Sequence, residues 1–399
     1  MRIGVWLPVD YNPESGGRFS YFDKLVHAID EYNFENEIEI IFITMSLQEM
    51  SFKKEVKVIS SLPTQLYFIK KIFQFSSFLT QLLNYFDKKI IKGKKGKALS
   101  KAGIDIIYYL RQRECHFPDF PFISTNWDIG HCSTFPFPEI TGKSKNKSRT
   151  NFYQDILPRA LMIFADSESG KQELLKYTDI GEHRISVIPI FSGNVSSMQM
   201  QNDVMENTLL KFGLCANKYF FYPAQFWAHK NHYGLISAFK TFLKNHNDYR
   251  LVLCGSDKGN LKYINTTIHK LGLTDFVLFL GFISNEEMYA LYYNATALIM
   301  ASWFGPTNMP PIEAMEIGCP VICSDIAGHS EILGDAALYF DPFDDNSLIH
   351  AMNEMTGKYE EFKRRIGDQN SKSIFKIENS MKLINRNMKR VAIIRRNWL

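Results

Sequence analysis

Residues 296–325 read TALIMASWFGPTNMPPIEAMEIGCPVICSD. Two short apolar runs in this stretch, ALIMA and VIC, are typical of buried strands. Between them, a turn rich in glycine and proline precedes a helical pattern. Pro310 and Pro311 mark the start of this helix, and we expect Glu313 to be an acid in its first turn. Two buried strands joined by a helix are parallel neighbours in one sheet. The stretch therefore predicts one strand–helix–strand unit of an α/β fold.

The same unit repeats through both halves of the chain, because short apolar runs alternate with helical patterns. The N-terminal runs are RIGVWLPVD, EIEIIFITM, DIIYYL, PFISTN, LMIFADS and RISVIPI, and the C-terminal runs are KYFFYPAQ, YRLVLCGSD, DFVLFLGFI, TALIMAS, PVICSD and AALYFDP. We therefore predict two doubly wound, Rossmann-like domains that face each other across a cleft. Their predicted bounds are 1–195 for the N-terminal domain, 196–217 for a linker, 218–375 for the C-terminal domain, and 376–399 for a helix and basic tail that crosses back to the N-terminal domain.

The composition is that of a folded protein without a strong overall charge. Hydrophobic residues make up 45% of the 399 residues and charged residues 22%, which excludes a disordered chain. The formal net charge of +4 is too small to predict nucleic-acid binding. The N-terminus lacks the long apolar segment of a signal peptide, and no stretch has the ~20 apolar residues of a transmembrane helix. We therefore expect a cytoplasmic protein.

Two basic segments are candidates for contact with an anionic membrane surface. Residues 64–101 begin with apolar residues at helical spacing and continue into seven lysines. Residues 386–399 carry five basic residues and no acid. Lysines beside an apolar helix face are attracted to anionic lipids, so we expect a peripheral location on the inner face of the cytoplasmic membrane. The alternatives are a core-facing helix followed by a solvated loop for the first segment, and a frayed tail for the second.

Two loops that follow predicted strands have features of a phosphate site. Gly16 and Gly17 come after the first strand and before a helical pattern, where backbone N–H groups can approach a phosphate without a Cβ in the way. Lys230 follows the first strand of the C-terminal domain, at the start of a helix whose dipole does not favour a cation. A bound diphosphate would explain this lysine. The alternatives are a tight turn at the glycines and an ordinary surface lysine at 230.

Residues 296–325 supply a third loop of this kind. Its turn exposes backbone amides, and the Glu313 carboxylate can accept hydrogen bonds from both hydroxyls of a ribose. The alternative is that Glu313 only stabilises the start of its helix. Asp341, Asp344 and Asp345 also follow a predicted strand, and we expect them to cap a helix rather than to hold an ion. The sequence therefore predicts no metal site.

Four C-terminal segments stand in the order PAQFWAHKNH, LVLCGS, FLGFIS and FGPTNMPPIEAMEIGCPVICSDIAGHSEILGDAALYFDP. With them, the chain from Phe220 to about Pro342 resembles the donor-binding domain of the retaining glycosyltransferases of family four, which have the GT-B fold. The N-terminal domain agrees through the Gly-Gly loop, NWDIGHCSTFPFPE, FADSESGKQELL and ISVIPI. The resemblance is to mannosyl- and rhamnosyl-type transferases of bacterial surface polysaccharide synthesis.

The resemblance implies a site for a nucleoside diphosphate sugar, in which Lys230 neutralises the diphosphate and Glu313 holds the ribose. The other donor-binding residues that it implies are Gly16 and Gly17 over the diphosphate, Gln225 beside the lysine, Gly255, Phe282 and Ile283 against the base, and Thr307, Asn308 and Met309 at the sugar and phosphates. The donor is a co-substrate, so no cofactor is implied. GDP-mannose is the favoured donor, with UDP and dTDP sugars left open.

Three positions depart from the family pattern. Gly305 stands where the resemblance implies the first of two glutamates, which contacts the transferred sugar, so we expect Thr307 and Asn308 to recognise the sugar instead. Gln225 stands where an arginine is common, which leaves Lys230 as the main positive charge.

The third departure lies in the N-terminal domain, where the usual His-Asp pair reads Trp127-Asp128, with His131 three residues on. Asp128 and His131 are therefore candidates to orient the acceptor hydroxyl or to act as a base.

The resemblance implies transfer of a hexose or deoxyhexose to a lipid-linked saccharide in O-antigen or capsule-type polysaccharide synthesis. Cleavage of the anomeric C–O bond develops negative charge on the departing diphosphate, which a fixed cation and backbone dipoles stabilise. Retaining members need no pair of carboxylates, because the acceptor attacks from the face that the diphosphate leaves, and a diphosphate oxygen takes the proton. Inversion would need a base. The alternatives are a sugar phosphorylase or nucleotide-sugar epimerase of the same fold, and a non-catalytic scaffold subunit.

Overall fold

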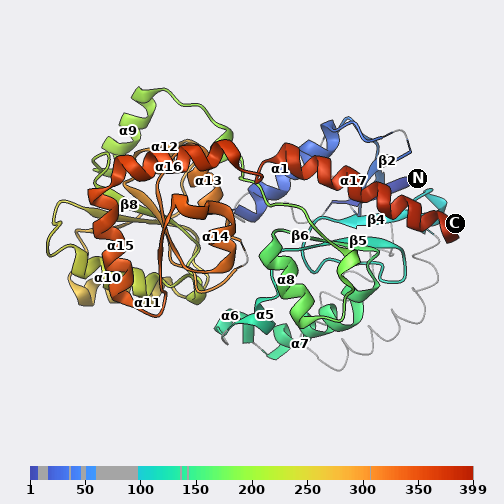
Figure 1. Ribbon diagram of the computed structural model, residues 1–399, viewed down its shortest axis with the longest axis horizontal. Helices are drawn as coiled ribbons and strands as arrows, with labels where there is room; N and C mark the ends of the chain where they lie inside the picture. The colour runs from blue at the N-terminus through green and yellow to red at the C-terminus, as the bar shows by residue number, and fades with distance from the viewer. Residues whose placement is uncertain are drawn as a thin grey trace.

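A computed structural model of the protein describes residues 1–7, 17–35, 37–45, 51–59, 98–134, 137–141, 143–305 and 307–398. Two parallel sheets, each in a domain of its own, make up its framework (Figure 1). The predicted fold class, two doubly wound α/β domains, is confirmed.

The N-terminal sheet has seven parallel strands in the order β3-β2-β1-β4-β5-β6-β7. Its strands are β1 (Arg2–Trp6), β2 (Glu39–Thr44), β3 (Val56–Val58), β4 (Ile106–Tyr109), β5 (Phe122–Asn126), β6 (Met162–Ala165) and β7 (Ile185–Val187). The helices described in this domain are α1 (Gly17–Glu31), α5 (Gly130–Ser133), α6 (Pro138–Thr141), α7 (Lys143–Asn151) and α8 (Glu168–Tyr177), with short turns η4 (Phe152–Ile156), η5 (Leu157–Arg159) and η6 (Glu182–Arg184).

The C-terminal sheet has six parallel strands in the order β10-β9-β8-β11-β12-β13. Its strands are β8 (Tyr219–Pro223), β9 (Arg250–Cys254), β10 (Val277–Phe279), β11 (Ala297–Met300), β12 (Val321–Ser324) and β13 (Leu338–Phe340). The helices that follow β7 are α9 (Asn202–Phe212), α10 (His232–Phe242), α11 (Leu261–Leu271), α12 (Asn285–Asn294), α13 (Met309–Ile317), α14 (Ala327–Leu333), α15 (Asp345–Gly357), α16 (Tyr359–Lys372) and α17 (Ile377–Arg395), with short turns η7 (Val195–Ser197), η8 (Ala228–Lys230), η9 (Gly334–Ala336) and η10 (Arg396–Trp398).

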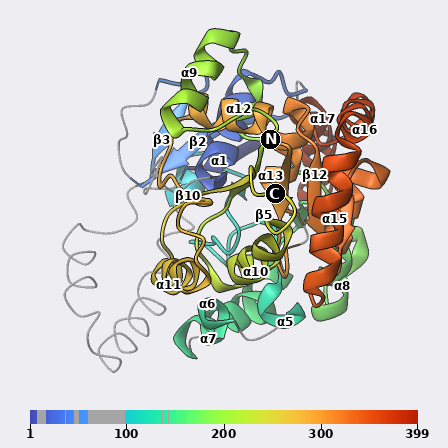
Figure 2. The same cartoon turned by 90° about the vertical axis from the view of Figure 1, so that its left-hand side faces the viewer.

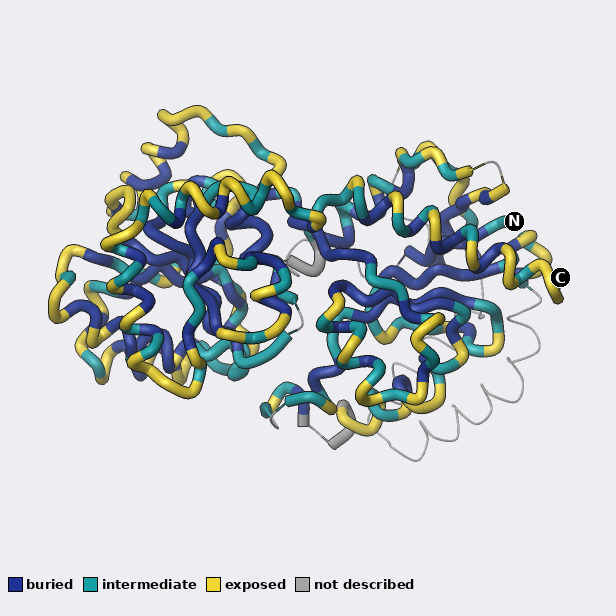
Figure 3. Tube along the Cα trace, in the orientation of Figure 1, coloured by how far each residue is buried: buried dark blue, intermediate teal, exposed yellow. Residues whose placement is uncertain are grey.

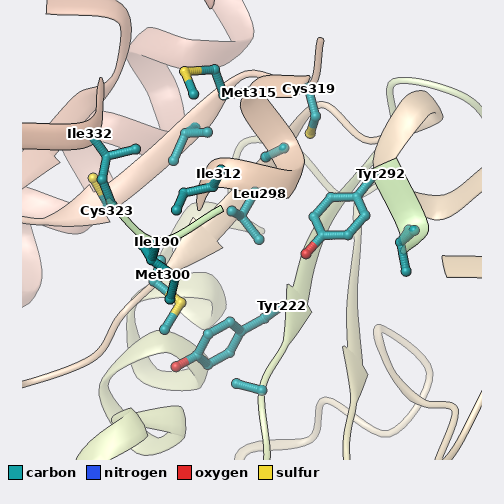
Figure 4. Packing of buried hydrophobic residues seen from close by; sticks show 14 of the residues in the cluster. Ile190, Tyr222, Tyr292, Leu298, Met300, Ile312, Met315, Cys319, Cys323 and Ile332 are labelled. Atoms are coloured by element: carbon teal, nitrogen blue, oxygen red, sulfur yellow. The ribbon is translucent and has the colours of Figure 1, made fainter. Parts of the chain in front are cut away.

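Helices cover both faces of the C-terminal sheet, α10 and α11 on one and α12 and α13 on the other, as Figure 1 and the turned view in Figure 2 show. The central strands are the most deeply buried parts of both domains (Figure 3). Figure 4 shows how α13 enters this core, where its Ile312 and Met315 belong to the same buried cluster as Leu298 and Met300 of β11. Both α13 side chains are fully buried, so packing fixes the position of this helix, which follows the loop after β11.

The strand order of each sheet reverses at one point, between β1 and β4 and between β8 and β11. In doubly wound sheets, ligands bind beyond the carboxyl ends of the strands on either side of this reversal. In the C-terminal domain, these two loops hold Lys230 and the stretch from Ser302 to Asn308.

Helix α17 leaves the C-terminal domain and runs along the N-terminal domain (Figure 1). The Lys389 ammonium pairs with Glu35, Arg396 with Glu37 at 2.5 Å, and Arg395 Nε donates to the Asp105 carbonyl at 3.3 Å. The alternative of a frayed C-terminal tail is therefore wrong as far as residue 398.

The expected membrane segment, residues 64–101, lies outside the described residues except for its last four, which are helical. In the described part of the chain, no helix combines the length and the apolar character needed to cross a bilayer.

Candidate functional site

Lys230 lies at the end of η8, between β8 and α10. Asn231 ends this turn with a left-handed backbone (φ 54°), and its side chain accepts a hydrogen bond from the Gly234 amide at 3.2 Å as the N-cap of α10. The Tyr222 hydroxyl donates to the Lys230 carbonyl at 2.6 Å. The local sequence therefore holds the lysine backbone from both sides.

The Lys230 ammonium donates to Asn308 Oδ1 at 2.7 Å and to Ser302 Oγ at 3.4 Å. Among the described residues, no carboxylate lies within ion-pairing distance of it. Burial lowers the pKa of Lys230 to about 8, and the negative charge of Asp128 partly opposes this shift. The alternative of an ordinary surface lysine is therefore wrong.

Glu313 lies in the second turn of α13, because this helix begins at Met309 with prolines in its first turn. The predicted start is confirmed, but the expectation that Glu313 is a first-turn acid is wrong. Its side chain is buried, and Tyr292 donates to Oε2 at 2.8 Å. Burial raises the pKa of Glu313, while the hydrogen bonds from Tyr292 and from the Gly193 amide lower it. The helix dipole therefore does not account for this carboxylate.

The residues expected at the base come together at the ends of β9 and β10. The Gly255 amide donates to the Gly281 carbonyl at 3.1 Å. Gly255 has φ +143°, and a Cβ there would lie 2.4 Å from the Ala224 carbonyl oxygen, so only glycine fits. In the next residues, Ile283 is buried and the Phe282 ring is 76% exposed. An exposed aromatic ring of this kind is available to stack on a planar ligand.

On the N-terminal side, Asp128 and His131 follow β5. Asp128 Oδ1 accepts from the Gly130 amide at 3.1 Å, and the Asp128 carbonyl accepts from Tyr153 Oη at 2.7 Å. The His131 ring lies against Tyr153, with centroids 4.9 Å apart. Burial and the nearby Arg149 lower the pKa of His131. A neutral imidazole near a carboxylate can accept or relay a proton.

Asp166, which the sequence reasoning did not single out, joins the two domains. It follows β6, is 3% exposed, and binds the hydroxyl of Thr307. Ser167 Oγ donates to its other oxygen at 3.1 Å. Burial raises the pKa of Asp166 to about 8. The available signal was an acid directly after a strand in FADSES.

Two other contacts join the domains. Glu139 Oε1 lies 2.5 Å from His229 Nδ1 and accepts from the His229 amide at 3.0 Å. The Phe304 ring lies 4.3 Å from the His229 ring. Glu331 of α14 accepts from the backbone amides that begin α8, including that of Ser169 at 2.9 Å. The domains therefore meet through the loops that follow their strands.

The remaining predicted residues have mixed placements. Gln225 Oε1 accepts from Trp227 Nε1 at 3.1 Å, and Met309 is the first residue of α13. Gly17 is the first residue of α1, whereas Gly16 lies outside the described residues. Asn308, expected at the sugar, uses both ends of its amide within the protein, because its Nδ2 lies 2.9 Å from His329 Nε2.

The acid cluster after β13 is a capping loop, as predicted. Asp344 is the N-cap of α15 and accepts from the Asn346 amide at 2.9 Å, and Asp341 Oδ1 accepts from the Phe343 amide at 2.9 Å.

Comparison with known proteins finds a family model that matches the C-terminal domain. Residues 215–373 match the family model described as glycosyl transferases group 1. The O-antigen chain mannosyltransferase B of Escherichia coli is 23% identical over 227 residues, which cover 57% of this chain and 58% of that protein. The O-antigen chain mannosyltransferase RfbU of Salmonella typhimurium is 30% identical over 197 residues, 49% of this chain and 51% of that protein. The chain thus spans little more than half the length of these curated relatives.

Solved structures resemble the whole chain. A glycosyltransferase from Rickettsia africae has a TM-score of 0.68 at 15% identity, over 98% of both chains. Anabaena Alr3699/HepE in complex with UDP-glucose has a TM-score of 0.68 at 15% identity, over 98% of this chain and 99% of the other. At this identity the likeness shows the fold alone. Residues 215–373 are therefore similar to the group 1 glycosyltransferases, and the chain as a whole has the GT-B fold.

Proposed function

We propose that the protein is a retaining glycosyltransferase that moves a hexose or deoxyhexose from a nucleoside diphosphate sugar to a saccharide acceptor. The observation that carries the proposal is the Lys230 ammonium, which neutral oxygens of Asn308 and Ser302 hold at the reversal point of the C-terminal sheet. A partly buried cation with neutral partners favours an anionic ligand. The group 1 glycosyltransferase domain around it makes a sugar nucleotide the fitting anion.

In this proposal, Lys230 meets the diphosphate, Glu313 accepts hydrogen bonds from the ribose, and Phe282 and Gly255 face the base. The names of the curated relatives, both O-antigen mannosyltransferases, support mannose as the transferred sugar and GDP-mannose as the donor. The structure of HepE in complex with UDP-glucose supports a UDP sugar as the second candidate donor.

The chemistry follows from the charges at the site. As the anomeric bond breaks, negative charge grows on the diphosphate, and Lys230 and the amides of the loop before α13 stabilise it. In the retaining course, a diphosphate oxygen takes the proton of the acceptor hydroxyl. Asp128 and His131 then orient that hydroxyl from the N-terminal side. No metal, cofactor or nucleic acid takes part in the proposed reaction.

The proposed acceptor is a lipid-linked saccharide at the inner face of the cytoplasmic membrane. Its support is the run of lysines within residues 64–101 and the O-antigen names of the relatives. The C-terminal tail supports it less, because Lys389 and Arg396 are already paired with Glu35 and Glu37.

The first test is a thermal-shift panel of UDP, GDP, CDP, dTDP and their sugar conjugates. A ligand at about 100 times its Kd stabilises a protein by about 2.7 kcal/mol. We expect one base to raise the midpoint, with GDP first. No shift from any member of the panel would contradict the proposal.

The second test uses the donor that responds, labelled in its sugar, with a lipid extract that contains polyprenyl-linked saccharides. We expect label in the lipid fraction and an anomeric configuration in the product that matches the donor. An inverted product would contradict retention and would assign the base role to Asp128 or His131. Release of sugar 1-phosphate in the presence of phosphate would favour the phosphorylase alternative.

A further inference from the structure

A chain of hydrogen bonds extends from Lys230 into the interior of the C-terminal domain. The Lys230 ammonium donates to Asn308 Oδ1 at 2.7 Å, Asn308 Nδ2 lies 2.9 Å from His329 Nε2, and His329 Nδ1 lies 2.8 Å from the Ser324 carbonyl oxygen. Four elements contribute to this chain: η8, the N-cap of α13, α14 and the end of β12. The direction of each hydrogen bond in this chain follows from which atoms can donate.

The Ser324 carbonyl can only accept, so His329 carries its proton on Nδ1 and presents a lone pair at Nε2. Asn308 must then donate its Nδ2 to the ring, which turns its Oδ1 toward the ammonium. Asn308 is 8% exposed and His329 fully buried. Burial lowers the pKa of His329 to about 4, so the ring is neutral at physiological pH and this arrangement persists.

The Asn308 amide also lies against the point from which a side chain at position 305 would extend. Gly305 has φ +122°, and a Cβ on it would lie 3.3 Å from Asn308 Nδ2 and 3.2 Å from the Thr307 carbonyl oxygen. The family resemblance implies a glutamate at position 305. In this chain position 305 has no side chain, and the group that contacts the Lys230 ammonium at 2.7 Å is the neutral amide of Asn308.

We propose that Asn308 and His329 are positioning residues, which aim the Lys230 ammonium at the donor diphosphate without neutralising its charge. This proposal rests on the proposed function. A carboxylate at hydrogen-bond distance would attract the ammonium strongly and compete with the diphosphate for it. An amide oxygen orients the ammonium through a single hydrogen bond and leaves the charge to the ligand.

The groups that act on the lysine charge come from both domains. Asp128 faces it from the N-terminal domain, and His229, His232 and His329 lie near enough to feel its charge. Burial lowers the pKa of each of these three histidines, and Asp128 is the neighbour that favours the charged form of the lysine. A new carboxylate at position 308 would therefore change the electrostatics of the lysine directly.

The test compares Asn308→Asp, His329→Gln and His329→Leu with the unaltered protein in two measurements. The first is the affinity, by calorimetry, for the nucleoside diphosphate that responds in the thermal panel and for the matching nucleoside. The second is the pH midpoint at which Lys230 reacts with acetic anhydride, followed by mass spectrometry.

Asn308→Asp is nearly isosteric, and we expect it to weaken diphosphate binding at least tenfold, to leave nucleoside binding within twofold, and to move the labelling midpoint of Lys230 to higher pH. His329→Leu removes the acceptor of Asn308 Nδ2 and should weaken diphosphate binding severalfold. His329→Gln keeps an acceptor and should recover most of that loss.

The matched controls are His246→Gln and Asn353→Asp. These residues form another histidine–asparagine pair, with His246 Nε2 and Asn353 Oδ1 2.9 Å apart on the surface of the same domain. Both controls should bind the diphosphate within twofold of the unaltered protein.

Two results would overturn the positioning role: an unchanged labelling midpoint and diphosphate affinity in Asn308→Asp, or equal losses of diphosphate and nucleoside binding. If His329→Leu does not fold, the near-isosteric Asn308→Asp decides the question. If the unaltered protein binds no nucleotide, the proposed function fails and this inference fails with it. Normal binding by the unaltered protein and by all three variants sinks the positioning role alone.

Discussion

Lys230 and Asp166 contact adjacent residues of one loop, yet they come from different domains and respond to burial in opposite ways. Lys230 binds Asn308 from the C-terminal side, and Asp166 binds Thr307 from the N-terminal side. Burial lowers the pKa of the lysine to about 8 and raises that of the aspartate to about 8. Below that pH the lysine is a cation while the aspartic acid is neutral.

Desolvation therefore has the same result in both domains, because it favours the protonated form of each group. The protonated lysine is charged, whereas the protonated aspartic acid is neutral. An aspartate and a lysine in direct contact with each other would form an ion pair. Here each bonds to a neutral side chain, so below about pH 8 these two groups together carry one positive charge. An anionic ligand therefore meets the lysine without first displacing a carboxylate from it.

The largest effect is expected when the cation is removed. Lys230→Ala should lower the rate of sugar transfer at saturating donor by about 10²–10³, the usual loss for one group that stabilises developing negative charge. Donor affinity should fall by less, because the charge on the diphosphate grows only as the bond breaks. Initial rates and calorimetric Kd values give the two quantities.

Lys240→Ala is the control for this change, since Lys240 is exposed in the last turn of α10, the helix that follows Lys230. It should transfer sugar at the normal rate. Equal losses of rate and affinity in Lys230→Ala would limit the lysine to ground-state binding.

The second prediction concerns the charge state of the same lysine. Because the pKa of Lys230 is about 8, kcat/KM for the donor should fall about tenfold for each pH unit above 8, as the free enzyme loses the cation. In Lys230→Arg the guanidinium stays charged throughout this range, so the alkaline fall should disappear even if the rate is lower. An alkaline fall of the same size in Lys230→Arg would assign it to another group.

The third prediction concerns the protonation of Asp166. The folded-state pKa of Asp166, about 8, lies above the unfolded value of about 3.9. The folded state therefore binds more protons between these values, and the contribution of this group to stability is lost as pH rises from 4 to 8, at up to about 1.4 kcal/mol per pH unit. Asp166→Asn should remove this loss.

Urea denaturation at pH 5 and pH 7.5 measures the effect as a change in the free energy of unfolding. Asp166→Asn should gain stability relative to the unaltered protein between the two pH values. Asp325→Asn, at an exposed position after β12, serves as the control and should not. A parallel pH dependence in the unaltered protein and Asp166→Asn would mean that Asp166 is ionised in the folded state.

A smaller effect is expected at a second buried carboxylate, Glu313, which lies on the donor side. Glu313→Gln should weaken donor binding about tenfold and change the transfer rate little, because an amide accepts hydrogen bonds from a ribose less strongly than a carboxylate. Calorimetry with the donor measures it, and Glu360→Gln, exposed in the first turn of α16, is the control. An unchanged Kd would place the ribose elsewhere.

Most of the fold was predictable because parallel strands buried on both faces form continuous apolar runs. Each of the twelve predicted apolar runs contains an observed strand, and of the strands in the described residues only β3 was not predicted. Its three residues are VKV, with Val56 39% exposed and Val58 42% exposed. A short, half-exposed edge strand has no apolar pattern by which to recognise it.

Only the parts of the site that depend on neighbouring residues in the sequence were predictable. Lys230, Gly255 and the loop before α13 follow strands, so strand prediction located them. The Asp166–Thr307 contact joins residues 141 positions apart, and the Glu139–His229 contact joins residues 90 apart. Such pairings depend on how two separate domains meet, which no periodicity within either domain records. The placement of Glu313 in the second turn was missed because two prolines and Met309 precede it inside the helix.

The return of α17 to the N-terminal domain has a consequence for the order in which the protein is made. Met388 and Val391 of α17 are buried in the same apolar cluster as Leu25 and Ile29 of α1. At about 5–20 residues per second, the ribosome reaches α17 roughly 20–70 s after α1. The first domain to be synthesised therefore waits for the last helix, and the second domain can complete its sheet before the first has buried its own surface.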